Sequence, residues 1–206
     1  MVKKVSIGVI GIQGAVTEHI QSMKELFKKT GTSGEVFPIK NIEEIKKIDG
    51  LIIPGGESTT ISRILFEKGF NKEIKKRVET DNLPIMGTCA GCVILAKKLN
   101  ENNHDVKLLG LIDIQVIRNA FGRQKESFEQ TIQIKGFKEP YNAVFIRAPI
   151  IEKAENTCNI LSKIDNKIIM ARQDNILALS FHPELTDDLR IHQYFLDIIL
   201  SLHNRH

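Results

Sequence analysis

In the first hundred residues, short apolar runs alternate with longer stretches in which apolar residues recur three or four positions apart. The runs of strand length occupy residues 5–12, 34–39, 50–53 and 83–86. The helical spacing predicts helices at residues 16–29, 42–48, 59–67, 72–80 and 90–99. Strands that alternate with helices predict a parallel sheet with helices on both faces.

The second half of the chain has a different texture. Strand-like runs follow one another with little helix between them, at residues 111–118, 129–134, 143–147, 159–163, 167–172 and 177–181. Close succession of strands favours antiparallel pairing. A final amphipathic helix is predicted at residues 188–202. The predicted fold class is a three-layer, doubly wound α/β fold, with a mostly parallel sheet, flanking helices and added antiparallel strands.

Composition narrows the class of protein. The 206 residues contain no linker, repeat or low-complexity tract, which predicts a single domain over residues 1–206. Lysines are scattered and not massed, so the net charge of +4 does not indicate nucleic-acid binding. The sequence has no run of eighteen apolar residues, so no membrane span is predicted. Three cysteines, an odd number, suit the reducing cytoplasm better than a disulfide framework.

The segment GTCAG at residues 87–91 is the strongest local sign of chemistry. An apolar run leads directly into it and a predicted helix leads out, which is the pattern of a nucleophile elbow with Cys89 at its tip. A helix N-terminus favours thiolate over thiol, and the amide of Ala90 can donate to a developing oxyanion. Taken alone, the segment also fits a tight turn around a buried structural cysteine.

A second sign is His182-Pro183-Glu184, which directly follows the apolar run at residues 177–181. A catalytic thiol needs a base, and the base needs an acceptor that orients it. His182 can take the thiol proton, and Glu184 can hold the imidazole in the useful tautomer. A lone histidine at the end of a strand is more often structural; the elbow earlier in the chain makes the catalytic interpretation stronger.

A third sign is the glycine-rich segment at residues 54–59, PGGEST, after the third apolar run. Glycines let backbone amides approach a ligand closely, so the Gly56 N–H is a candidate second oxyanion donor beside that of Ala90. The Walker pattern and its lysine are missing, and Gly8, Gly11 and Gly14 do not have the spacing of the dinucleotide fingerprint. The sequence therefore does not predict nucleotide binding.

Together these segments resemble the class I glutamine amidotransferases, which use a Cys-His-Glu triad. Within that class they look like the glutaminase subunits of two-component pyridoxal 5′-phosphate synthases. RNAFGRQ and FIRAP are specific to this branch, whereas His-Pro-Glu is widely shared. The segments that carry the resemblance follow one another along nearly the whole chain: GVIGIQGAV at residues 8–16, PGGEST at 54–59, RNAFGRQ at 118–124, FIRAP at 145–149 and HPELT at 182–186.

The resemblance implies a role for each matching residue. Cys89 is the nucleophile, and His182 and Glu184 complete the triad. Gln13 and Gly14 lie where the oxyanion hole and the partner contact meet. A substrate α-carboxylate favours a guanidinium, which supports the arginines of the site. The implied L-glutamine-binding residues are Gly56, Glu57, Ser58, Arg118, Ile146 and Arg147.

The resemblance also implies a partner. Ammonia released in open water would be protonated and lost, so such a glutaminase works docked on a synthase subunit. In this family that subunit is a (β/α)₈ barrel, in a large hetero-oligomer that makes pyridoxal 5′-phosphate. The proposed chemistry needs neither a metal nor an organic cofactor, and no membrane or nucleic-acid partner is expected.

Three alternatives stay open at this point. Another triad glutaminase, such as that of imidazole-glycerol-phosphate synthesis, shares the elbow but not RNAFGRQ or FIRAP. A cysteine-elbow protein of the stress-response or chaperone type, acting as a redox sensor or binding module, is the second, although it would usually place a histidine just after the elbow cysteine, where this chain has Ala90. Cys92 departs from the family pattern and creates a formal C-x-x-C with Cys89, which raises a redox interpretation of its own. An inactive scaffold subunit is the third, although the triad is complete. We expect Cys92 to pack as a small buried apolar residue.

Overall fold

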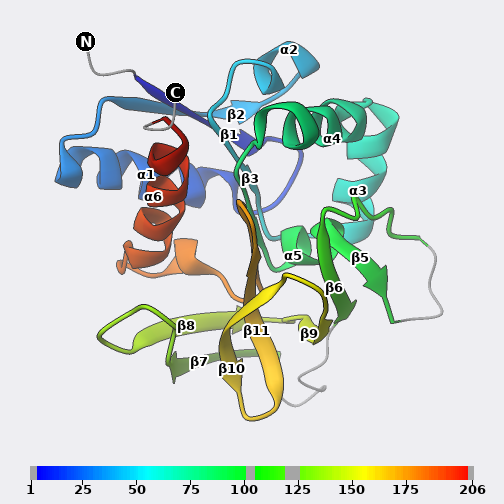
Figure 1. The fold of residues 1–206 in the computed structure, drawn as a ribbon, viewed down its shortest axis with the longest axis vertical. Coiled ribbons are helices and arrows are strands. Elements are labelled where there is room, and N and C mark those ends of the chain that lie inside the picture. The colour runs from blue at the N-terminus through cyan, green and yellow to red at the C-terminus, as the bar shows by residue number, and fades with distance from the viewer. Residues whose placement is uncertain (1–3, 101–104, 119–125, 204–206) are drawn as a thin grey trace.

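A computed structural model describes residues 4–100, 105–118 and 126–203. Most strands belong to one sheet of ten, whose path runs β2-β1-β3-β4-β12-β11-β9-β6-β5, with β10 paired to β11 (Figure 1). A hairpin of β7 and β8 forms a separate two-stranded sheet. Residues 119–124 of the RNAFGRQ segment lie outside the described residues. The predicted α/β fold class is confirmed.

The parallel half of the sheet is built from the apolar runs of the first half plus one late strand. Their pairing is parallel throughout, and β4 lies between β3 and β12. Burial on both faces explains why these strands read as continuous apolar runs and not as alternating ones. The strands are β1 (Val5–Ile10), β2 (Gly34–Ile39), β3 (Gly50–Ile53), β4 (Ile85–Thr88) and β12 (Ile176–Leu179).

Helices cover both faces of this half. Helices α1 (Val16–Thr30) and α6 (Arg190–His203) pack side by side on one face, where Met23 and Phe195 belong to one apolar cluster (Figure 1). The opposite face carries the second cluster, which includes Ile61 and Ile94. Its helices are α2 (Ile42–Ile45), α3 (Ser58–Glu67), α4 (Phe70–Asp81) and α5 (Ala90–Leu95).

The second half supplies the antiparallel strands that its texture predicts. The pairs β6–β9, β9–β11, β10–β11, β11–β12 and β7–β8 are all antiparallel, whereas β5 and β6 are parallel. The strands are β5 (Ala96–Leu99), β6 (Ile112–Ile117), β7 (Ser127–Ile132), β8 (Tyr141–Ile146), β9 (Ile150–Ala154), β10 (Asn159–Ile164) and β11 (Lys167–Gln173). A short 3₁₀ helix, η1 (Pro183–Leu185), precedes α6.

One predicted element was wrong, and one strand was missed. The helix expected to reach residue 99 ends at Leu95, because the amides of Leu109 and Leu111 take the carbonyl oxygens of Ile94 and Leu95, and the chain then continues as β5. Strand β9 was not predicted, because its exposed Glu152 and Lys153 hide the alternation of a strand. In both cases backbone pairing with distant segments outweighs the local pattern.

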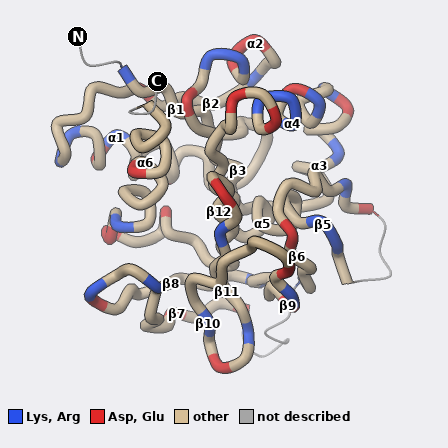
Figure 2. The backbone as a smooth tube through the Cα atoms, in the orientation of Figure 1, with Lys and Arg blue, Asp and Glu red and all other residues tan. Residues whose placement is uncertain are grey.

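Charges are mixed along the surface elements. Lysines, an arginine, glutamates and an aspartate all occur along α4, and the two glutamates of α2 are followed by Lys46 and Lys47 (Figure 2). Within the described ranges, no helix has both the length and the apolar character needed to cross a bilayer.

Candidate active site

Cys89 stands at a strained turn between β4 and α5. Its backbone has φ 49° and ψ −103°, a conformation that L residues rarely adopt. The neighbouring glycines are required by close packing, because a Cβ on Gly91 would lie 2.0 Å from the Ile53 carbonyl oxygen. The Cys89 amide donates to the Leu179 carbonyl, 2.8 Å away, which ties the elbow to β12. The predicted nucleophile-elbow geometry is therefore present.

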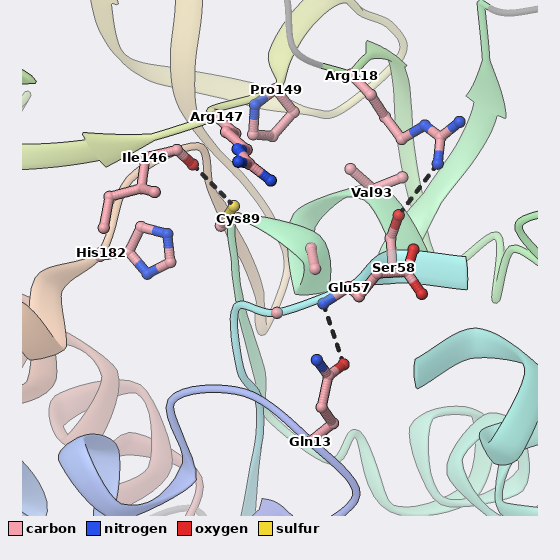
Figure 3. Close-up of a pocket in the computed structure, with 12 residues that line it drawn as sticks. Gln13, Glu57, Ser58, Cys89, Val93, Arg118, Ile146, Arg147, Pro149 and His182 are labelled. Carbon is pink, nitrogen blue, oxygen red and sulfur yellow. Dashed lines mark hydrogen bonds between the residues drawn. The ribbon is translucent and has the colours of Figure 1, made fainter. Parts of the chain in front are cut away.

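His182 and Glu184 meet next to this elbow. Nδ1 of His182 lies 2.7 Å from Oε1 of Glu184, and the Glu184 side chain is fully buried. The His182 amide donates to the Val144 carbonyl at 2.8 Å, so β8 holds the loop in place. Figure 3 shows the imidazole beside Cys89. A Cβ on Gly55 would contact both residues, 2.4 Å from Cε1 of His182 and 3.3 Å from Cβ of Cys89.

The loops after β1 and β3 lock together at the same edge of the sheet. The Ala15 amide donates to the Gly55 carbonyl at 3.1 Å, and the Glu57 amide donates to Oε1 of Gln13 at 3.1 Å. Gly14 has a positive φ of 98°, and Gly56 has φ 153°. Every described peptide bond is trans. Since C=O and N–H of a trans peptide point in opposite directions, the Gly56 N–H points away from Ala15.

A cavity of about 370 Å³ opens above the elbow. Arg118 and Arg147 both line it, and Nη1 of Arg118 lies 3.4 Å from Oγ of Ser58 (Figure 3). Its volume is at the small end of the range for small-molecule sites. The lining residues are Gln13, Gly56, Glu57, Ser58, Cys89, Ala90, Val93, Arg118, Ile146, Arg147, Pro149 and His182.

The structure thus brings together residues that are far apart in the sequence. All of the residues singled out by sequence line the cavity except Gly14 and Glu184. Gly14 packs against Gly55 and Gly56 behind the loop, and Glu184 lies behind His182. Val93 and Pro149 line the cavity without having been predicted; Pro149 closes the FIRAP segment that the resemblance had marked.

Comparison with known proteins decides the family. The profile of the SNO glutamine amidotransferase family matches residues 9–201. This chain belongs to that family. The pyridoxal 5′-phosphate synthase subunit PdxT of Methanococcoides burtonii is 51% identical over 198 residues, covering 95% of this chain and 99% of its own. The subunit of that name from Pyrococcus furiosus is 46% identical over 197 residues, covering 95% of this chain and all of its own.

Solved structures agree with this membership. A crystal structure described as a glutamine amidotransferase is 38% identical and superposes with a TM-score of 0.85, covering 94% of this chain and 98% of its own. A glutamine amidotransferase from Thermotoga maritima has a TM-score of 0.61 at 14% identity, covering 98% of each chain, which supports the fold alone. The amidotransferase fold therefore extends over the length of the chain.

Electrostatics of the amidotransferase site favour a charged His182. Burial alone would lower the pKa of His182, but hydrogen bonding to Cys89 and Glu184 outweighs it and raises the pKa to about 10. Burial would likewise raise the pKa of Glu184, but the adjacent His19 and His182 hold it below its ordinary value. Glu184 is therefore an acceptor carboxylate, and the imidazolium of His182 is stabilised between it and the thiol.

Other side chains of the amidotransferase site have structural partners. Both carboxylate oxygens of Glu57 accept from backbone amides of α3, Oε1 from Thr59 and Oε2 from Thr60. Glu57 thus caps this helix while its side chain lines the cavity. Sγ of Cys89 lies 3.7 Å from the Ile146 carbonyl oxygen. Arg147 adopts a positive φ of 44°, and its amide donates to the Glu126 carbonyl at 2.7 Å.

Cys92 packs as predicted, in the apolar cluster under α5, with no exposed surface. Burial raises its pKa well above the ordinary thiol value, so it remains a thiol. All three cysteines are free. Among the described residues, no group of three or more His, Cys, Asp and Glu is arranged to hold a metal ion.

Sequence reasoning missed a group of polar residues behind His182 and Glu184. His19, Thr88 and His192 have no exposed surface, and His19 contacts Thr88, His192 and Glu184. A signal was available, because His19 shares the apolar face of α1 with Met23 and Phe27. A histidine on such a face is ordinarily a core residue, and nothing in the local sequence connects it to residues 182–184.

Proposed function

We propose that this chain is the glutaminase subunit of a pyridoxal 5′-phosphate synthase, which hydrolyses L-glutamine to L-glutamate and ammonia and passes the ammonia to a synthase subunit. One observation carries the proposal: the strained Cys89 lies beside a buried His182–Glu184 pair, at the floor of a cavity that two arginines line. The names of the curated relatives support the assignment to this synthase.

In the proposed first step, the Cys89 thiolate attacks the side-chain carboxamide carbon of glutamine. The tetrahedral oxyanion accepts hydrogen bonds from the amides of Gly56 and Ala90. His182, charged through its contacts with Cys89 and Glu184, gives its proton to the leaving amine. Collapse breaks the C–N bond, releases ammonia and leaves a γ-glutamyl thioester on Cys89.

The second step restores the enzyme. His182, now neutral, takes a proton from water, and the resulting hydroxide attacks the thioester carbon. The same two amides hold the second oxyanion. Collapse then breaks the C–S bond, returns the Cys89 thiolate beside the His182 imidazolium and releases the γ-carboxylic acid, which gives its proton to solvent to become L-glutamate, so that atoms and charge balance over the cycle.

Binding of the amino-acid end of glutamine uses the opposite wall of the cavity. Arg118 and Arg147 are the cationic groups that line it, and they suit the α-carboxylate of the substrate. Ser58 contacts Arg118 on this wall, whereas the backbone carbonyl of Ile146 lies 3.7 Å from Sγ of Cys89 (Figure 3). Glu57 adds a negative charge that suits the substrate ammonium group. This placement leaves the carboxamide end nearest Cys89.

The proposed partner is the (β/α)₈-barrel synthase subunit of the large hetero-oligomer that the resemblance implies. Gln13 and Gly14 would connect docking to catalysis, because their loop is bonded to the Gly55–Glu57 backbone that carries the oxyanion donor. A partner that presses on the loop after β1 therefore acts directly on the catalytic backbone.

The test is ammonia and glutamate release from L-glutamine, measured for the chain alone and with its cognate synthase subunit. We expect hydrolysis that rises on mixing and disappears in Cys89→Ala. Cys92→Ala is the matched control, because it removes a second cysteine three residues away. Absence of hydrolysis in both conditions, with folded proteins and reduced Cys89, would overturn the proposal.

A further inference from the structure

The far side of the triad acid is occupied by a second imidazole. Glu184 turns Oε1 toward His182, and its other oxygen, Oε2, lies 3.3 Å from Nε2 of His19. The side chains of His19 and Glu184 are both completely buried. His19 belongs to α1, has no exposed surface and does not line the cavity, so it reaches Glu184 from inside the core.

His19 is held in place by two further contacts. Its Nε2 lies 3.1 Å from Oγ1 of Thr88, the residue before the nucleophile. Its Nδ1 lies 3.2 Å from Nε2 of His192 on α6. Thr88 also accepts a hydrogen bond from the Gly55 amide, 3.0 Å away. The ring of His19 is therefore fixed between three elements that meet under the active site.

Oxygen Oε2 of Glu184 is the atom that the contact with His19 affects. Its 3.3 Å contact with His19 is an ion-pair distance and not a formed hydrogen bond, and within the described part of the chain Oε2 has no hydrogen-bond partner. A buried carboxylate oxygen without a donor is costly. The dipole of an N–H on Nε2 of His19 reduces that cost, and a small rotation of the ring would complete the bond.

The protons of the two buried histidines can be assigned from their partners. Burial lowers the pKa of His19, and burial together with His19 lowers that of His192 to about 3, so both rings are neutral near pH 7. A proton on Nε2 of His19 faces Thr88 and Glu184, and Nδ1 then accepts from Nε2–H of His192. His192 keeps an unprotonated Nδ1, the atom that has no described partner.

The opposite assignment is physically worse. It would turn the lone pair of His19 Nε2 toward the Glu184 carboxylate. It would also leave an N–H on Nδ1 of His192 buried without an acceptor. Either assignment leaves one buried donor without an acceptor among the described residues, the Thr88 hydroxyl in the first and Nδ1–H of His192 in the second. The repulsion between a lone pair on Nε2 of His19 and the Glu184 carboxylate therefore decides for the tautomer that aims an N–H at Glu184.

We propose that His19 is a positioning residue for the triad, which presents its Nε2–H to Oε2 of Glu184 and so keeps Oε1 directed at Nδ1 of His182. The inference rests on the proposed glutaminase function and adds a fourth residue to that site. His19 does not line the cavity, so it acts on the chemical step through Glu184 and not on substrate binding.

Two substitutions of His19 separate the contact with Glu184 from the presence of a polar side chain. The amide nitrogen of glutamine reaches the position of Nε2, whereas that of asparagine reaches only the position of Nδ1, toward His192. We expect His19→Asn to lower kcat roughly tenfold to a hundredfold with KM nearly unchanged. His19→Gln should recover most of kcat. Both are measured with the cognate synthase subunit present.

The pH profile supplies a readout that a purely structural role would not change. The titratable groups facing His19 are Glu184 and His182 on the loop after β12, His192 on α6, and Glu18 on its own helix. Without the Nε2–H, Oε1 of Glu184 is no longer kept directed at Nδ1 of His182. The His182 imidazolium then loses its acceptor, and its pKa falls. The alkaline limb of kcat/KM should therefore lie at lower pH in His19→Asn than in His19→Gln or the unsubstituted chain.

Alkylation of Cys89 tests the inference without requiring turnover. Iodoacetamide labelling of the chain alone, read on the peptide that carries Cys89, should need higher pH in His19→Asn and not in His19→Gln. If the unsubstituted complex releases no glutamate, the proposed function fails and this labelling still decides the role of His19. Equal kcat and equal labelling profiles in folded His19→Asn and His19→Gln would overturn the inference, as would a change confined to KM.

Two substitutions of His192 test the inference if His19→Asn does not fold, as judged by thermal unfolding. His192→Phe removes the donor to Nδ1 of His19, and His192→Gln keeps an N–H near the position of Nε2. We expect the labelling profile of Cys89 to move to higher pH in His192→Phe alone. Identical profiles in this pair, with both variants folded, would contradict the proposed proton arrangement.

Discussion

A Cβ atom on Gly14 would lie 1.7 Å from the carbonyl oxygen of Gly55. The two glycines belong to different loops, after β1 and after β3, and this contact sets the position of the peptide that carries the Gly56 amide. The adjacent bond from the Ala15 amide to the Gly55 carbonyl joins the loops at the same place. Any side chain at residue 14 must therefore push the proposed oxyanion donor away from its present position.

Gly14→Ala is expected to lower kcat roughly a hundredfold, because small displacements of catalytic groups have effects of this size. Gly31→Ala is the matched control: Gly31 also has a positive φ, 67°, but a Cβ there meets nothing within 4 Å. The control should lose about 1 kcal/mol of stability and keep its activity. Glutaminase assays and thermal unfolding of both variants measure this difference. Equal activities in the two variants would contradict it.

Glu184→Gln should lower kcat by at least roughly a hundredfold, as for neutralised triad acids elsewhere. The amide keeps the size of the side chain but removes the charge that helps raise the pKa of His182 to about 10. The imidazolium is then less stable, so the alkaline limb of kcat/KM moves to lower pH. The assay is a pH series of glutamine hydrolysis.

Asp188→Asn is the control for that experiment. Asp188 is a carboxylate four residues further along, and it pairs with Arg190 outside the cavity. Its neutralisation should leave the pH profile where it is. A profile that moves equally in both variants would mean that general charge, and not the contact with His182, sets the pKa.

Stability should rise with pH between about pH 5 and 6.5. The folded-state pKa of His192, about 3, lies below its ordinary value of 6.5, so the unfolded chain binds more protons in this window. The stabilisation is complete above pH 6.5 and is lost as the pH falls. Each such histidine contributes a slope of up to about 1.4 kcal/mol per pH unit, and the lowered pKa of His19 acts in the same direction.

Urea unfolding at pH 5.0, 5.5, 6.0 and 6.5 measures this slope, above the range in which most carboxylates titrate. His192→Gln should flatten it, since glutamine does not titrate and keeps a donor toward His19. His203, half-exposed at the C-terminal end of α6, provides the control substitution His203→Gln. An unchanged slope in His192→Gln would show that His192 is already protonated in the folded chain.

Cys92→Ala should retain full glutamine hydrolysis and the same response to reductant. The Cys92 side chain packs in the apolar cluster and does not line the cavity, so its loss leaves only a small void that costs about 1 kcal/mol. Activity measured after mild oxidation and after reduction tests the redox alternative. Protection from reversible inactivation in Cys92→Ala, but not in Cys158→Ala, would establish a disulfide between Cys92 and Cys89.

Local sequence was sufficient to predict strands that are buried on both faces and turns that are marked by glycines. Strands β2 and β3 have the predicted bounds, and the elbow around Cys89 follows directly from an apolar run that ends in two closely spaced glycines. Local sequence was not sufficient at β5 and β9. Residues of β5 become a strand because they pair with β6, and those of β9 because they pair with β6 and β11. Pairing of this kind depends on segments far away in the chain.

The candidate site divides in the same way. The residue types and their order along the chain were sufficient to predict the proposed nucleophile, base and acid, because that chemistry requires a thiol, an imidazole and a carboxylate in reach of one another. Only the tertiary structure decided what lies behind the acid. His19 and His192 come from helices at opposite ends of the sequence. His19 contacts Glu184, and His192 contacts His19, because α1 and α6 pack side by side on one face of the sheet.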